Sequence, residues 1–496
     1  MGIYETFEAK VRRISKLESV SALLRWDQET YLPKMGAADR GDQLTLLASI
    51  AHEEFVGGEM GSLLASLTEE EAQGRLDPDA SVNLREVRRS FEREKKLPAE
   101  LVEEIAMAHA QGFQAWGEAR EAQDFGIFAP CLERNVELQK QVAELFGYKD
   151  HPYDAFLDLY EPGVTTQQLA AMFQGLKEHI LPVLETVERC QGSDLNGIAG
   201  AAPVDRQVEL VERIAREMGF DFAAGRVDRS EHPFSTSLSP RDVRVTAHYY
   251  HDDPFRAIFT ILHEGGHGLY RQGTQWEHRG MPTGDIVSAG VDESQARFWE
   301  NVVGRSHAFW RYTLPQFKTV FPGIADHLNV DDVYAMVNRV RRSLIRVGAD
   351  ELTYNLHIML RFEIERDLLG GSCRVEDLPA IWNGKMRTYL GMTPSTVVEG
   401  VLQDIHWSDS YFGYFPTYTL GNLYAAQLGR AIHNTIPDME DHVALGDFRP
   451  LREWLREKIH RHGKRLLPTE LIEQATGSPP SSDAFVEYVR AKYLRS

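Results

Sequence analysis

The sequence predicts a mostly α-helical protein with one short region of β-strand. Apolar side chains recur at three- and four-residue spacing along much of the chain, which is the pattern of an amphipathic helix. Strand-like alternation is confined to about residues 232 to 250. The hydrophobic fraction of 43% is spread evenly and no long low-complexity linker interrupts the chain, so we expect residues 1–496 to form one large domain.

Four helices are indicated by their apolar stripes and end signals. One lies near the N-terminus, one follows Thr165, one precedes Gly219 and one follows Asp331. Their stripes are Val11, Ile14, Leu17, Val20 and Leu24; Leu169, Phe173, Leu176 and Ile180; Val208, Val211, Ile214 and Met218; and Val333, Met336, Val340 and Leu344. Residues 194–203 and 477–483 are rich in turn-forming types, and we expect them to be loops within the domain.

A further helix carries the most informative segment of the chain. Asp252 and Asp253 followed by Pro254 indicate an acidic N-cap and a proline at the first helical position. The apolar stripe that follows consists of Phe255, Ile258, Phe259 and Leu262. The helix then contains His263 and His267, which share one face at i and i+4 and can converge on one metal ion. With Glu264 beside the first histidine, this is the H-E-x-x-H pattern of zinc hydrolases.

Two glycines between the histidines favour a functional helix. Gly265 and Gly266 each cost about 1 kcal/mol relative to alanine inside a helix. The missing side chains leave room for a metal ion, a substrate backbone or a closely packed second helix. The alternative is an ordinary amphipathic helix with two solvent-facing histidines.

A catalytic zinc site with two histidines usually has a carboxylate as third protein ligand. Ser288 can cap a helix in which Glu293 falls in the first turn, beside an apolar stripe. Spacing alone does not separate Glu293 from the other acidic residues downstream. The candidates are Glu277, Asp285, Asp292, Glu293 and Glu300.

From His232 to Gln427 the chain resembles the carboxypeptidase Taq family, the M32 metallocarboxypeptidases. The resemblance rests on six ordered motifs: His232-Pro233-Phe234, Asp242-Val-Arg244-Val-Thr246, His263-Glu264-Gly-Gly-His267, Glu293-Ser294-Gln295, Ile345-Arg346-Val-Gly-Ala349-Asp350, and Gly400-Val-Leu-Gln403-Asp404-Ile-His406-Trp407. It implies a zincin-like, two-lobed helical body with a deep active-site groove, a small β element beside the metal helix, and a homodimer.

The resemblance also implies roles for individual residues. His263, His267 and Glu293 would hold a divalent ion, zinc or the substitute cobalt, and Glu264 would act as general base towards the attacking water. One position departs from the family pattern, because Asp292 stands where the family usually has histidine before the ligand glutamate. An extra carboxylate there would alter the metal preference of the site or the acidity of a zinc-bound water.

A carboxypeptidase also needs a cation for the terminal carboxylate of its substrate, and arginine suits this role because it donates two parallel hydrogen bonds. Arg244, Arg346 and Arg430 are the candidates. Arg346 lies in a family motif and is our first choice, with an ion pair to Asp350 as the structural alternative. Arg244, in a strand-like run, would pair with the substrate or brace the metal helix, and we favour bracing.

Three further polar side chains could serve the substrate by donating a hydrogen bond to the developing oxyanion. They are His232, His406 and Tyr418. Each has a structural alternative: His232 precedes a proline and could close a turn, Trp407 could shield His406 in a core, and Tyr418 belongs to an aromatic run that could simply pack.

Charge and cysteine content indicate which partners and which cellular compartment to expect. The net charge of −20 argues against nucleic acid as a partner, because phosphate binding relies on lysine and arginine clusters. Cys131, Cys190 and Cys373 are odd in number and far apart, which suits free thiols in a reducing cytoplasm. Without a secretory signal or transmembrane run, we expect a cytoplasmic protein with no membrane partner.

Three functions are consistent with these features. The favoured one is a zinc-dependent carboxypeptidase that removes single residues from peptides with a free C-terminus. The alternative is a helical zinc oligopeptidase that cleaves internal bonds of short peptides and needs no carboxylate anchor. The third is a non-catalytic helical scaffold or metal-binding interaction protein, against which the intact Glu264 argues.

Overall fold

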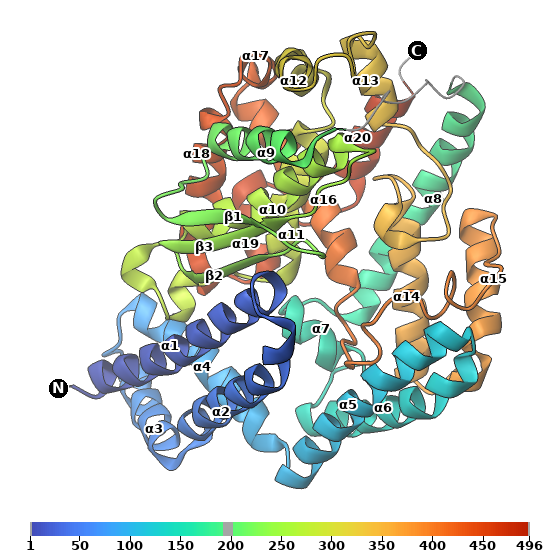
Figure 1. Cartoon of the computed structure of the whole chain (residues 1–496). Coiled ribbons are helices and arrows are strands. Elements are labelled where there is room, and N and C mark those ends of the chain that lie inside the picture. Colours follow the sequence, from blue (N-terminus) through green and yellow to red (C-terminus); the bar gives the residue numbers. More distant parts are fainter. Residues whose placement is uncertain (1, 192–201, 495–496) are drawn as a thin grey trace.

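A computed structural model describes residues 2–191 and 202–494 and confirms a mostly helical protein with a small sheet (Figure 1). The α-helices of the first half are α1 (Ile3–Thr30), α2 (Ala37–Val56), α3 (Gly58–Ala72), α4 (Pro78–Lys96), α5 (Ala99–Ala122), α6 (Phe125–Phe146), α7 (Asp154–Tyr160), α8 (Thr166–Cys190) and α9 (Val204–Met218). After the sheet follow α10 (Pro254–Gly273), α11 (Ala289–Arg297), α12 (His307–Val320), α13 (Val330–Val337), α14 (Tyr354–Leu369), α15 (Leu378–Leu390), α16 (Pro416–Thr435), α17 (Met439–Ala444), α18 (Arg449–Lys458), α19 (Pro468–Thr476) and α20 (Asp483–Tyr493).

Short helical turns connect several of these elements. They are η1 (Lys34–Gly36), η2 (Trp276–His278), η3 (Pro282–Gly284), the π-helix η4 (Phe298–Val303), η5 (Arg346–Gly348), η6 (Val375–Asp377) and η7 (His460–Arg465). In the described part of the chain, no helix has an apolar stretch long enough to cross a membrane.

The buried apolar side chains form two separate clusters, in line with the two lobes that the family resemblance implies. The smaller cluster belongs mainly to α1, α3 and α4, with Phe7, Leu64 and Leu84 at its centre. The larger cluster joins α5 to α20 and the sheet. In Figure 1 the smaller lobe is the blue group of helices beside the sheet. A groove of about 1300 Å³ runs between α1, α2 and α4 on one side and β2 and residues 271–286 on the other.

The sheet has three strands in the order β1-β3-β2 and lies against the helix that carries the histidine pair. β1 (Gly225–Arg229) is parallel to β3 (Asp242–Ala247), and β2 (Ser235–Ser239) is antiparallel to it. Val243 and Val245 of β3 are fully buried towards the larger core. Strands β2 and β3 fall within the predicted region, whereas β1 precedes it. The sequence of β1 has alternating charges and begins with glycine, so it does not show a strand-like pattern. Pairing with β3 makes this segment a strand.

Most predicted helix ends are confirmed. The Thr165 side chain accepts a hydrogen bond from the Gln168 amide at the start of α8, and Gly219 ends α9 in the left-handed conformation with φ of 98°. Gly477 ends α19 in the same way, and a non-helical segment separates it from α20, as expected for residues 477–483. Residues 194–201 of the other expected loop lie outside the described residues.

The helix predicted after Asp331 is shorter than its apolar stripe suggests. α13 ends at Val337, so Val340 and Leu344 are not helical, which corrects the prediction. Two side chains satisfy the end of this helix. Arg305, from outside the segment, donates to the Val337 carbonyl, and the side-chain amide of the C-cap residue Asn338 donates to the Tyr334 carbonyl at 2.9 Å. The chain then runs to Asp350 without an α-helix, and the short turn η5 in this segment carries Arg346.

Candidate functional site

The histidine pair lies in the middle of α10, as its stripe and proline predict. Pro254 is the first residue of the helix and Asp253 occupies the N-cap position. A Cβ atom on Gly266 would lie 2.7 Å from the backbone of Ala296 in α11, so only glycine allows the two helices to approach this closely. A Cβ atom on Gly265 would instead lie 3.3 Å from the flexible side chain of Met218. Of the three explanations for these glycines, close packing against other parts of the protein is the one that the structure shows.

α11 brings a carboxylate to the histidines. Its N-cap is Ser288, whose hydroxyl accepts a hydrogen bond from the Val291 amide at 3.1 Å, as predicted. Glu293 lies one turn further on, and its Oε2 is 3.8 Å from Nε2 of His267. A Cβ atom on Gly421 of α16 would come within 2.4 Å of the Glu293 side chain, so this glycine makes the space that Glu293 occupies.

Three potential ligand atoms, one each from His263, His267 and Glu293, lie within 4.8 Å of one another. The two imidazole centroids are 5.1 Å apart with their planes at 82°. Two imidazoles and one carboxylate are the donor set of many catalytic zinc sites, so the side chains present fit a divalent ion. Of the other acidic candidates, Asp285 pairs with Lys464 at 2.7 Å, and neither it nor Glu277 joins this group.

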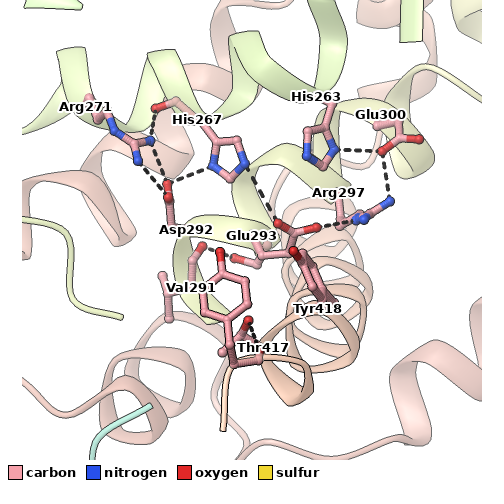
Figure 2. A network of polar contacts seen from close by, with 12 residues as sticks. His263, His267, Arg271, Val291, Asp292, Glu293, Arg297, Glu300, Thr417 and Tyr418 are labelled. Atoms are coloured by element: carbon pink, nitrogen blue, oxygen red, sulfur yellow. Dashed lines mark hydrogen bonds and ion pairs between the residues drawn. The ribbon is translucent and has the colours of Figure 1, made fainter. Parts of the chain in front are cut away.

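Each histidine contacts an outer carboxylate through its other ring nitrogen (Figure 2). Nδ1 of His263 lies 2.9 Å from Glu300, and Nδ1 of His267 lies 2.9 Å from Asp292. Both contacts leave Nε2 for a metal ion, and contacts of this kind fix the orientation of a ligand ring. Glu300 and Asp292 were both ligand candidates from spacing alone. Each contacts the Nδ1 side of a histidine ring, opposite the Nε2 atom that is left for the ion.

The π-helix η4 places Glu300 in this position. α11 gives way to η4 after Arg297, and the wider turn was not predicted from the sequence. Arg297 donates from Nε to Glu293 at 2.7 Å and from Nη1 to Glu300 at 3.1 Å. Burial alone would raise the pKa of both carboxyls, but the charge of Arg297 and the histidines outweighs it and holds both pKa values below their ordinary range.

Glu264 differs from the other carboxylates of the site. It is only 8% exposed, and among the described residues it has no hydrogen-bond or ion-pair partner. Burial raises the pKa of Glu264 above its ordinary value, against the opposing effect of the two histidines. A carboxylate that is buried, unpaired and easily protonated suits a group that accepts and returns a proton.

Arg346 is buried, but its ion-pair partner is not the predicted one. Its Nε and Nη2 donate to Asp404 at 3.0 and 2.7 Å, and its Nη1 donates to the Tyr354 hydroxyl at 2.9 Å. The suggested pairing with Asp350 is wrong, because that carboxylate accepts from the Leu352 and Thr353 amides before α14. Asp350 thus satisfies local backbone donors, while the carboxylate for Arg346 comes from the Gln-Asp-x-His-Trp motif.

A second buried arginine shares Asp404. Nε of Arg361 donates to the other carboxylate oxygen at 2.7 Å, and Arg361 is fully buried. Two guanidinium groups on one carboxylate leave an excess of positive charge. Burial, with the charges of both arginines, lowers the pKa of the neighbouring His406 to about 4, so this imidazole is neutral at pH 7.

Tyr418 and His406 lie close to this cluster. The Tyr418 hydroxyl is 3.5 Å from Nε2 of His406, and the Arg346 guanidinium lies 5.0 Å from the centroid of the Tyr418 ring. The His406 ring stacks on Phe415 at 4.4 Å. Figure 2 shows Tyr418 beside Glu293. Three of the predicted substrate-binding residues therefore form one group, and Tyr418 is the member that lies beside the donor set (Figure 2).

The remaining candidates lie elsewhere. Arg244 of β3 donates to Asp242 at 3.0 Å and lies 4.2 Å from the centroid of the Trp26 ring. These contacts join the sheet to α1 and not to the histidine helix that Arg244 was expected to brace. Arg430 lies near the end of α16 and pairs with the exposed Glu487. His232 is exposed, and its carbonyl accepts a hydrogen bond from Ser230.

Sequence reasoning missed several residues of the site. Arg271 follows His267 by four residues and Arg297 follows Glu293 by four, so helical spacing could have indicated both. Arg361 and Tyr354 had no such signal, because their partners come from distant segments.

Comparisons with known proteins identify the family of the chain. The sequence model of the carboxypeptidase Taq (M32) metallopeptidases matches residues 6–493. The chain is 41% identical to Thermostable carboxypeptidase 1 of Thermus thermophilus, covering 97% of this chain and 96% of the relative. It is 38% identical to Carboxypeptidase 1 of Bacillus subtilis, with 97% and 96% covered. The solved M32 carboxypeptidase from Deinococcus radiodurans R1 is 38% identical, with a TM-score of 0.95 over 99% of this chain and 98% of that structure.

Proposed function

The chain belongs to the carboxypeptidase Taq (M32) family of metallopeptidases, and from this premise we propose that it is a metal-dependent carboxypeptidase with zinc held by His263, His267 and Glu293. The observation that carries the ligand assignment is the grouping of these three donor atoms within 4.8 Å. Cobalt is a possible substitute for zinc. The contacts of both imidazoles through Nδ1 support the assignment, because they leave Nε2 for the ion.

Glu264 is the proposed general base. When bound, the divalent ion acidifies water and polarises the carbonyl of the scissile bond. Glu264 takes the proton of the attacking water and passes it to the departing amine nitrogen as the peptide C–N bond breaks. Its burial and its lack of an ion-pair partner among the described residues support this role, since a raised pKa allows it to hold the proton between the two steps.

The terminal carboxylate of the substrate is proposed to bind near Arg346. The excess positive charge of Arg346 and Arg361 over Asp404 supports this location. The Nε and Nη2 edge of Arg346 is already occupied by Asp404, so Arg346 either uses its remaining N–H groups or orients the group that binds. Tyr418 and the neutral His406 are the proposed hydrogen-bond donors to the reacting peptide.

A comparison of free-acid and amidated peptides tests the exopeptidase assignment. We expect the chain to release single residues from a peptide with a free C-terminus and to leave its C-terminal amide nearly uncut. Equal cleavage of both peptides, at an internal bond, would favour the oligopeptidase alternative. Loss of hydrolysis on chelation, restored by zinc or cobalt, would exclude a non-catalytic scaffold.

We also propose that residues 1–496 act as one domain in a cytoplasmic homodimer. The family match over residues 6–493 supports the first point. The free thiols of Cys131, Cys190 and Cys373 support a reducing compartment. The dimer is an expectation from the family resemblance alone, and light scattering after size-exclusion chromatography tests it.

A further inference from the structure

Arg271 lies one helical turn after His267 on α10 and is not part of the proposed donor set. Its Nη1 and Nη2 donate to the two carboxylate oxygens of Asp292 at 3.0 and 2.9 Å (Figure 2). Nη1 also donates to the backbone carbonyl of His267 at 3.1 Å. One guanidinium group therefore holds both the main chain of a proposed ligand and the carboxylate that contacts its ring.

Within residues 2–191 and 202–494, Asp292 has a single arginine partner, whereas Glu300, the carboxylate that contacts the other histidine, has two. Glu300, which contacts His263, pairs with Arg297 at 3.1 Å and with Arg305 at 3.4 Å. Asp292 is only 8% exposed, and Arg271 is the only lysine or arginine paired with it among the described residues. A buried carboxylate that loses its cation is unfavourable and rearranges to find another partner.

The ring of His267 lies between this carboxylate and the carboxylate of Glu293. Asp292 Oδ1 lies 2.9 Å from Nδ1, and Nε2 on the opposite side of the ring faces Oε2 of Glu293 at 3.8 Å. A displacement of Asp292 therefore releases the edge of the imidazole that sets the direction of Nε2.

We propose that Arg271 is a positioning residue of the metal centre, which holds Asp292 so that Asp292 orients His267 towards the ion. This rests on the proposed ligand set. The pair also accounts for aspartate before Glu293, because the two-pronged contact with Arg271 compensates its charge. Arg271 itself touches neither the donor atoms nor Glu264 through any hydrogen bond or ion pair of the described residues.

The test is the affinity of the apoprotein for Zn²⁺, measured by competition with a chromophoric chelator. Arg271→Met should weaken Zn²⁺ binding by about 10- to 100-fold, the usual effect of removing an outer-shell partner. It should also change the visible absorption spectrum of the Co²⁺-loaded protein, which reports the geometry of the ligands. Arg256→Met is the matched control, since Arg256 lies exposed on the same helix over the Tyr250 ring. The control should bind Zn²⁺ like the parent.

A double-mutant cycle shows whether Arg271 acts through Asp292. If it does, Arg271→Met adds little to Asp292→Asn, and the double variant binds Zn²⁺ about as well as Asp292→Asn alone. Fully multiplicative losses, or parental affinity and spectrum in Arg271→Met, would overturn the proposal.

Two further variants keep the outcome unambiguous. If Arg271→Met does not fold, Arg271→Lys replaces it, because lysine keeps the charge but not the two-pronged contact. Parental Zn²⁺ affinity in that variant would equally overturn the proposal. His267→Ala is measured in parallel: if it still binds Zn²⁺ like the parent, the ligand assignment itself fails, which is a different result from an inert Arg271.

Discussion

Replacement of Arg346 by alanine tests the carboxylate anchor most directly. The change removes a buried guanidinium that donates three hydrogen bonds, two to Asp404 and one to Tyr354. Asp404 keeps Arg361 as a partner, so the variant leaves no unpaired buried carboxylate and we expect it to fold. What disappears is the excess positive charge beside Tyr418.

The loss of a charged contact from a desolvated site costs about 2 to 5 kcal/mol. At about 1.4 kcal/mol for each factor of ten, kcat/KM for free-acid peptides should fall by roughly 30-fold or more. Amidated peptides lack the terminal charge, so their slow cleavage should change little. Arg346→Lys should recover little of the loss, because lysine keeps the charge but cannot restore the planar contacts to Asp404 and Tyr354 that hold it in place.

The assay is steady-state hydrolysis of one peptide in its free-acid and amidated forms, with circular dichroism and metal content measured on the same samples. Arg430→Ala is the control, since this arginine pairs with the exposed Glu487 and, among the described residues, not with Asp404. A folded, metal-loaded Arg346→Ala variant that retains its preference for the free acid would refute the reasoning. If the variant unfolds, Arg346→Gln removes the same charge with a smaller change of side-chain volume, and an undiminished preference there would also contradict it.

Three further predictions follow from the same geometry. Glu293→Ala should lose the metal, whereas Glu264→Gln should keep it with turnover reduced by at least about 100-fold. Metal analysis with activity assays checks both variants. Full metal occupancy in Glu293→Ala, together with metal loss in Asp292→Ala, would move the ligand assignment by one residue. Asp292→His should shift the pH profile or change metal affinity by about 10- to 100-fold without abolishing activity, and a variant indistinguishable from the parent would show that Asp292 has only a structural role. Burial raises the pKa of Glu365 to about 7, although the hydrogen bonds from Tyr153 and Trp407 act in the opposite direction. The folded state therefore favours the protonated carboxyl, and the stability that this protonation contributes is lost as the pH rises through about 7. The melting temperature of the parent should therefore fall relative to that of Glu365→Gln between pH 5 and pH 8, and parallel curves would contradict this.

Local spacing was sufficient wherever one helix sets the geometry. His263 and His267 share a face of α10 because four residues make about one turn, and Ser288 caps α11 because its hydroxyl reaches the amide three residues on. The choice of Glu293 over its acidic neighbours came from the family motifs. Periodicity could not make that choice, since Asp292 and Glu300 are also directed at the histidines, one residue earlier and two turns later.

Periodicity failed where partners from elsewhere override a local preference. The apolar stripe after Asp331 predicts a helix through Leu344, but Arg305 from a distant segment binds the Val337 carbonyl and α13 ends there. Likewise β1 is a strand only because β3 pairs with it. In both cases the deciding hydrogen bonds join residues that periodicity treats separately.

By itself the sequence determined the helical fold class and the helix that carries the histidine pair, because these depend on residue types at fixed helical spacing, and the family motifs added Glu293 to the proposed donor set. Only the tertiary structure decided which groups surround that set. Asp404 reaches Arg346 across 58 residues, and Glu300 reaches His263 across 37 through a π-helix that no spacing rule indicated. Arg244 proved to join the sheet to α1 because Trp26 lies under it. Such pairings depend on how distant segments pack, and the energy of that packing is not contained in any local pattern of residues.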